Sequence, residues 1–139
     1  MEQLIELLKT LYLIRFYAKD IHYNAKGPDF WSDHEFADEI YKDIDDYIDD
    51  INEVLFLGYE KIPPTSKEVL QVVVQELPPV STDTTQCWKN LYGLVGNALD
   101  IIEGIEAEWD MPALNSVLDN VSNDLQKKRG LIWRRKISI

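Results

Sequence analysis

Cysteine and histidine are nearly absent from this chain of 139 residues, which contains one cysteine and two histidines. Cys87 has no second cysteine with which to form a disulfide within the chain. The N-terminal residues MEQLIELL contain glutamates where a secretory signal would contain lysines. We therefore expect a protein of the reducing cytoplasm.

Basic residues and long apolar runs are also scarce. The chain has 14 lysines and arginines against 25 aspartates and glutamates, and its formal net charge is −11. A surface of this sign repels nucleic acid and anionic membranes and attracts cations. No apolar run approaches the roughly 20 residues that span a bilayer. We expect a soluble protein with no membrane partner, and the length fits a single domain over residues 1–139.

Apolar residues recur at helical spacing through most of the chain. One such segment covers residues 2–24, and a second continues until Gly58 ends it. The Gly27-Pro28 turn separates the two segments, and either Asp29 or Ser32 is placed to cap the second helix. The first half of the chain is therefore expected to form a helical hairpin.

A long connection follows this hairpin. Residues 58–80 contain two Pro-Pro pairs on either side of the stretch TSKE. This stretch is typical of a capping box, with Thr65 as the N-cap and Glu68 three positions later. We expect a crossover that carries one short helix.

A second pair of helices completes the pattern. The third helix is expected to start at Ser81 or Thr82 and to end near Trp109. In the fourth, Asp110 is the expected N-cap and Pro112 an early helical residue. Two hairpins joined by a long connection predict an all-α, ferritin-like four-helix bundle with a short extra helix in the crossover.

The second helix gathers residues of metal-binding type on one face. Each residue of an α-helix is rotated by about 100° about the helix axis. With this rotation, one sector about 100° wide contains His34, Asp38, Asp49 and Glu53. Imidazole and carboxylate groups are good iron ligands. Most acids on such an acidic helix are merely solvated, and His34 and Asp49 lie about 22 Å apart along the axis. Either the site is absent or two chains share it.

The spacing of these residues is symmetric. His34 and Glu53 lie equally far from the point between residues 43 and 44, and so do Asp38 and Asp49. If two copies of the helix pack antiparallel about a two-fold axis there, each residue lies opposite its counterpart in the other copy. The pattern predicts two symmetric sites per dimer.

His22 lies across the Gly27-Pro28 turn from His34 and can join the same cluster. Each site would then contain two imidazoles from one subunit and carboxylates from the other. The alternative interpretation is that both histidines only pack or cap the turn.

These residues resemble the signature of the Dps proteins, the mini-ferritins. HYNAKGPDFWSDHEFADEIY, followed by IDDINE and Leu57-Gly58, is similar to that signature in its two histidines twelve residues apart, its Lys-Gly-Pro turn and its Asp-x-x-x-Glu pair. The match is close over residues 18–60 and looser in the crossover, and the last two helices match mainly in length and pattern.

The resemblance implies a hollow homo-dodecamer that binds iron and oxidises Fe(II), preferentially with hydrogen peroxide, and stores ferric mineral inside. It implies a ferroxidase that protects against oxidative damage. Carried over by position, the catalytic and metal-binding residues are His22, His34 and Asp38 from one subunit with Asp49 and Glu53 from its two-fold neighbour.

Two aromatic residues and four acids are further candidates for a functional role. Tyr23 stands where many relatives have a tryptophan, and Tyr23 and Trp31 are both candidates for a nearby oxidisable aromatic residue. Acids near the turn between the third and fourth helices are candidate pore residues, although a solvated helix end is the simpler interpretation: Glu103, Glu106, Glu108 and Asp110.

DNA binding is possible but not favoured. The chain begins almost at the first helix, so the Lys-rich arm that many relatives use on DNA is not expected. The basic C-terminal stretch Lys127–Lys136 holds six of the fourteen lysines and arginines. It either contacts phosphates or complements the C-terminal end of the last helix.

Two other functions remain as alternatives. One is a Dps-like protein that forms shells or condenses DNA with little or no ferroxidase activity. The other is a di-iron protein whose site lies inside one subunit. The second is disfavoured because the chain contains no Glu-x-x-His pair, the motif from which such sites are built.

Overall fold

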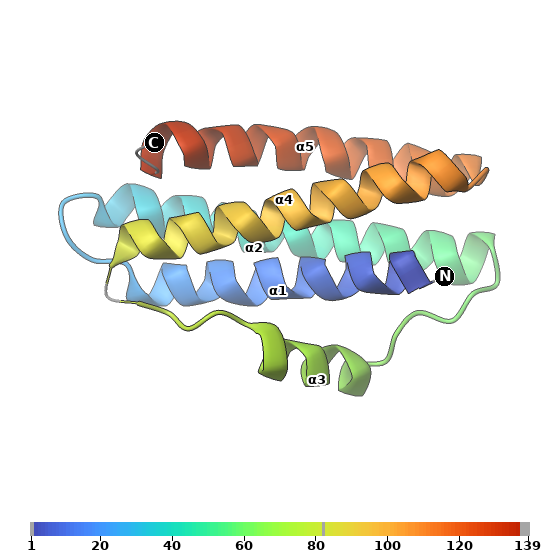
Figure 1. Ribbon diagram of the computed structural model, residues 1–139, viewed down its shortest axis with the longest axis horizontal. Coiled ribbons are helices and arrows are strands. Elements are labelled where there is room, and N and C mark those ends of the chain that lie inside the picture. The colour runs from blue at the N-terminus through green and yellow to red at the C-terminus, as the bar shows by residue number, and fades with distance from the viewer. Residues whose placement is uncertain (1, 82, 137–139) are drawn as a thin grey trace.

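The computed structural model describes residues 2–81 and 83–136 and consists of helices joined by loops. In chain order these are α1 Glu2–Asn24, α2 Phe30–Glu53, the π-helix η1 Val54–Gly58, α3 Ser66–Glu76, α4 Thr84–Glu108 and α5 Pro112–Lys136. The four long helices lie side by side, and the chain returns along the bundle through α3 before α4 begins (Figure 1). The predicted four-helix bundle with a helical crossover is confirmed.

Apolar side chains from all four long helices meet in one core. Leu11 and Ile14 of α1, Ile44 of α2 and Leu118 of α5 are fully buried. The Phe36 and Trp88 rings stack between α2 and α4 at 5.3 Å. Because each helix buries one stripe and exposes the rest, most polar residues of α2 remain outside, and Asp33, which is 2% exposed, is the exception that is buried.

The turn between α1 and α2 depends on a glycine. Gly27 has a φ of 96°, a conformation that costs little only for glycine. Its carbonyl accepts a hydrogen bond from the Phe30 backbone at 3.1 Å, which starts α2. Asp29 occupies the predicted N-cap position but makes no side-chain capping bond, and Ser32 lies inside the helix.

The end of α2 differs from expectation in one respect. The chain stays helical up to Gly58, as predicted, but its last turn is the π-helix η1. Such a turn is wider than an α-turn and rotates the following side chains about the helix axis. The sequence contains no signal from which we predicted this widening.

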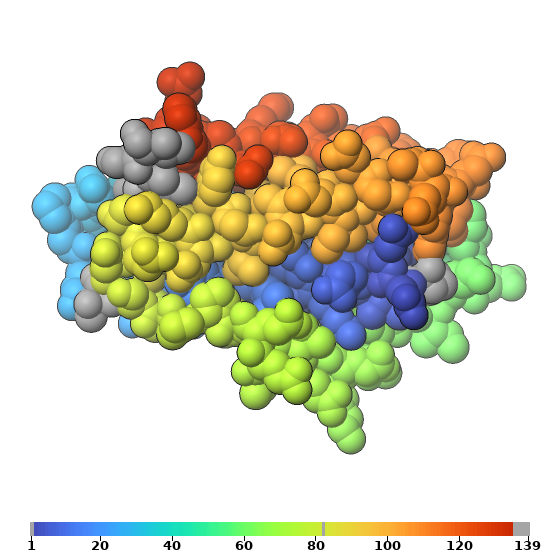
Figure 2. Space-filling view, viewed as in Figure 1, coloured from blue at the N-terminus to red at the C-terminus, as the bar shows by residue number. Residues whose placement is uncertain are grey.

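The crossover helix α3 has the predicted start. The Thr65 hydroxyl accepts from the Glu68 backbone while Glu68 reaches back to Thr65, which completes the capping box. Val69 and Val73 pack with Leu13 of α1 in a small separate cluster. Figure 2 shows α3 protruding from the bundle beside α1.

The starts of α4 and α5 correct two predictions. Helix α4 begins at Thr84, after Ser81, because the Asp83 side chain accepts the capping hydrogen bond from Gln86. Thr82, the other expected start, lies outside the described residues. Helix α5 begins at Pro112, so Asp110 lies too early to be its N-cap.

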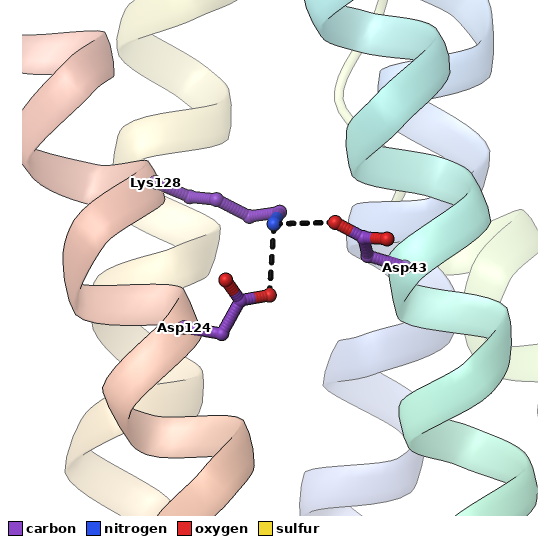
Figure 3. Close-up of polar contacts among 3 residues, drawn as sticks. All are labelled: Asp43, Asp124 and Lys128. Atoms are coloured by element: carbon purple, nitrogen blue, oxygen red, sulfur yellow. Dashed lines mark hydrogen bonds and ion pairs between the residues drawn. The ribbon is translucent and has the colours of Figure 1, made fainter.

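An internal cation joins α5 to α2. Lys128 donates to Asp43 at 2.7 Å and to Asp124 at 2.8 Å, and its side chain is only 6% exposed (Figure 3). Burial acts to lower the pKa of Lys128, but the hydrogen bonds to Asp124 and Asp43 outweigh it, so the pKa is raised. Lys128 is therefore a structural cation.

Within residues 2–81 and 83–136, no helix is long and apolar enough to cross a bilayer.

Candidate metal centre

The two histidines of the chain lie against each other at the α1–α2 turn. Their ring centroids are 3.7 Å apart and the ring planes differ by 17°, so the imidazoles are stacked. His22 belongs to the last turn of α1 and His34 to the second turn of α2. The predicted pairing across the Gly27-Pro28 turn is therefore present in a single chain.

Reciprocal hydrogen bonds fix both rings. Nδ1 of His22 donates to the carbonyl of His34 at 2.8 Å, and Nδ1 of His34 donates to the carbonyl of His22 at 2.7 Å. A carbonyl only accepts, so each Nδ1 carries a proton, and Nε2 is the ring nitrogen whose lone pair can bind a metal ion. Backbone carbonyls orient metal-binding histidines in the same way.

These bonds also hold the turn closed, because each connects the end of one helix to the start of the other. The interpretation of the histidines as turn-packing groups is thus partly correct. It does not compete with metal binding, since Nδ1 performs the first role and Nε2 is left for the second. Both imidazoles are partly exposed, which leaves them accessible to an ion.

Aromatic rings surround the imidazole pair. Phe30 stacks on His34 with centroids 5.1 Å apart, and Tyr41 meets His22 edge-on at 5.6 Å. Tyr23 is 70% exposed and also lies edge-on to His22, at 5.2 Å. Three apolar surfaces therefore restrict the rotation of the imidazoles.

Asp38 is a carboxylate of the same chain that interacts with His22. Lys42 donates to it at 2.7 Å. The hydrogen bond from Lys42 lowers the pKa of Asp38, and a hydrogen bond from Tyr41 and the proximity of His22 act in the same direction. Asp38 is thus an ionised acceptor beside the histidine pair.

The remaining two predicted ligands do not join this group. Asp49 and Glu53 are exposed on the outer face of α2, several turns beyond Asp38. Within the described part of the chain, no three histidine, cysteine or acidic side chains lie close enough to hold a metal ion together. One chain therefore brings together His22 and His34 with Asp38 nearby, and leaves the other two carboxylates apart.

Sequence reasoning missed four residues around this group: Tyr41, Lys42, Lys19 and Phe30. Tyr41 and Lys42 lie three and four residues after Asp38, the spacing at which helical side chains meet, so helical geometry contained a signal for both. Lys19 places its ammonium 5.5 Å from the Tyr41 ring centroid. The stacking of Phe30 on His34 depends on the shape of the turn and had no such signal.

The acids at the α4–α5 turn form one notable pair. Glu106 of α4 meets Asp119 of α5, and burial, assisted by this neighbouring carboxyl, raises the pKa of Glu106 to about 6. The other three candidate pore residues, Glu103, Glu108 and Asp110, are exposed. A pore would need further copies of the chain, so the role of these acids stays a prediction.

The basic C-terminal stretch provides fewer free charges than its sequence indicates. The ammonium of Lys128 is paired with Asp43 and Asp124, and the Arg129 guanidinium lies over the Tyr92 ring at 4.4 Å. The side chains of residues 135 and 136 lie outside those that the structure describes. Lys127 and Arg134 remain exposed.

Among comparisons with known proteins, the solved structures support the fold. No family model matches the sequence, and no curated protein matches it. Among solved structures, the chain is similar to the crystal structure of a Dps protein from Vibrio cholerae O1, described as a member of a broad superfamily of ferritin-like diiron-carboxylate proteins. The TM-score is 0.65 at 17% identity, over 94% of this chain and 84% of that chain.

Proposed function

We propose that this chain, with its ferritin-like bundle, is a Dps-type mini-ferritin that oxidises Fe(II) and stores the ferric product. The observation that carries the proposal is the stacked pair His22 and His34, with each Nδ1 tied to a carbonyl and each Nε2 left for a metal ion. Asp38 adds an ionised carboxylate beside the pair. Both histidines of the chain are therefore part of this one group.

A second copy of the chain completes each site in this proposal. His22, His34 and Asp38 of one subunit would bind Fe(II) together with Asp49 and Glu53 of the two-fold neighbour. The equal distances of the ligand pairs from the point between residues 43 and 44, on a helix that is continuous from Phe30 to Glu53, support this arrangement. An isologous dimer would contain two such sites.

The chemistry assigned to this site is a two-electron reduction of hydrogen peroxide. Two Fe(II) ions each give up one electron, the O–O bond breaks, and two protons complete two molecules of water. Carboxylates favour the harder Fe(III) product and so assist the electron transfer. Delivery of both electrons to one peroxide limits the release of hydroxyl radical, which accounts for the protective role.

The remaining parts of the proposal concern assembly. A single domain over residues 1–139 would form a hollow dodecamer built from two-fold dimers, located in the cytoplasm. The net charge of −11 would attract Fe(II) to its surface, and acids at the α4–α5 turn, Glu103 among them, are candidates for a pore.

Anaerobic loading with Fe(II), followed by one half-equivalent of hydrogen peroxide, tests the oxidation. We expect rapid formation of Fe(III) in the unmodified protein and slow formation of Fe(III) in His22→Ala/His34→Ala. Equal rates in both proteins, with no mineral formed in either, would refute the proposal. Light scattering on the same samples measures the assembly, and a stable monomer would exclude a shared site.

A further inference from the structure

The outer face of α2 carries a single lysine. Lys42 binds Asp38 of its own chain, yet its side chain is 65% exposed. Asp45 falls on the same face at about 100° per residue, and it keeps 48% exposure although Arg15 contacts it. Both groups are therefore accessible to a partner that approaches this face.

Lys42 and Asp45 share the symmetry of the ligand positions. They lie equally far from the midpoint between residues 43 and 44, so an antiparallel copy of α2 places each opposite the other. The same relation in residue number holds for Trp31, which is 73% exposed in the first turn of α2, and Phe56, which is 48% exposed in η1 just beyond the end of α2. A lysine matches an aspartate, and one aromatic ring matches another.

We propose that a second copy of this chain docks antiparallel on the outer face of α2, with Lys42 of each copy paired to Asp45 of the other. Trp31 of each copy then packs against Phe56 of the other at the two ends. This inference rests on the proposed function and deepens it, because it names contacts of the dimer that the ligands alone do not provide.

Charge explains why such contacts are needed. Without Lys42, antiparallel copies of this face would bring acids against acids, with Asp38 opposite Asp49 of the partner subunit, and like charges across an interface disfavour association. The lysine places an opposite charge near the two-fold axis. Exposed aromatic residues at both ends add apolar surface that a partner can bury.

The exchange of partners has a consequence for the site. In the single chain Lys42 holds Asp38 at 2.7 Å, which occupies one oxygen of that carboxylate. When Lys42 turns to Asp45 of the partner subunit, the oxygen of Asp38 becomes available to Fe(II). Docking and readiness of the site are thereby linked through one side chain.

A charge-swap experiment tests the pairing. Self-association is measured by sedimentation equilibrium in EDTA, which removes bridging metal ions, for the unmodified chain, Lys42→Glu, Asp45→Lys and the double variant. We expect each single variant to weaken the dimer about tenfold and the double variant to recover most of that loss. The double-mutant cycle cancels the loss of the Arg15 contact, which both Asp45→Lys proteins share.

Lys42→Glu/Asp46→Lys is the matched control, since it has the same composition and net charge but places the new lysine off the face. Equal recovery in both double variants would overturn the inference while leaving the ferroxidase proposal intact, provided that the unmodified chain associates and oxidises Fe(II). An unmodified chain that stays monomeric at all concentrations would overturn both. Recovery in the Asp45→Lys double alone supports the pairing.

Discussion

The two sides of α2 use the same residue type in opposite ways. On the side facing α5, Asp43 is neutralised within the chain by Lys128, whose side chain is 6% exposed (Figure 3). On the outer side, Asp49 and Glu53 are exposed and join no group of metal-binding side chains in the described part of the chain. The Asp43 carboxylate has a cation from its own chain, whereas Asp49 and Glu53 have none among the described residues.

The difference separates structure from function along one helix. A carboxylate that neutralises a buried cation of its own fold cannot be removed without leaving that cation uncompensated, so it serves the fold and is unavailable for other chemistry. A carboxylate left at the surface contributes little to folding and keeps its oxygens for a ligand or a partner. The location of the counter-cation therefore tells the two kinds of aspartate apart.

The largest expected effect is on oxidation. Asp49→Asn/Glu53→Gln should slow peroxide-dependent Fe(II) oxidation about 100-fold, because iron loses its two carboxylates from the neighbouring subunit. The free energy of unfolding should stay nearly constant, since both side chains are exposed. Stopped-flow absorbance of Fe(III) measures the rate. Asp46→Asn/Asp50→Asn on the same helix is the matched control, and an equal loss there would mean that only total charge matters.

Lys128→Met should show the reverse pattern. The substitution leaves Asp43 and Asp124 facing each other without a cation. We expect the free energy of unfolding to fall by about 2 kcal/mol. This loss is smaller than that for a fully buried ion pair, because both aspartates are partly exposed. Lys127→Met is the control and should change the free energy of unfolding by less than about 0.5 kcal/mol. Urea unfolding of both variants measures the difference. A Lys128 variant as stable as the Lys127 variant would contradict the structural role.

Mixing two inactive chains tests whether the outer side really needs a partner. His22→Ala/His34→Ala retains both distal carboxylates, and Asp49→Asn/Glu53→Gln retains both histidines. After unfolding and refolding together in equal amounts, about a quarter of the sites should be intact, because half of the dimers are mixed and each has one complete site. The oxidation rate should recover to about that fraction. Absence of any recovery would place the whole site within one chain.

Local sequence rules predicted most of the fold. The capping box at Thr65 and the glycine of the α1–α2 turn act over a few residues, and both were confirmed. The start of α4 was placed too early because several adjacent residues can cap a helix. Only the structure shows that Asp83 binds the Gln86 backbone.

The placement of the two histidines was predicted from the sequence, whereas the burial of Lys128 was not. The two histidines were placed together correctly because a short turn limits where they can lie. Lys128 was counted with a basic tail, although it follows Val121 and Leu125 at the spacing of the buried stripe. Composition counts a charged residue without regard to the direction in which its side chain points, whereas the burial of that side chain depends on this direction.

The smallest expected effect comes from a carboxylate whose neighbour is another acid. Glu106 has a pKa raised to about 6 by burial and by Asp119, so the folded protein binds its proton more tightly than the unfolded chain does. Stability should therefore fall as pH rises from about 4.5 through about 6, and Glu106→Gln should remove that decline. Because the group is partly exposed, solvent screening limits the difference to about 0.5 kcal/mol. Urea unfolding at pH 4.5 and pH 7 measures it, with exposed Glu103→Gln as the matched control. If both variants change the pH dependence equally, the Glu106–Asp119 contact has no special effect, and acids at this turn behave like those on the outer side of α2.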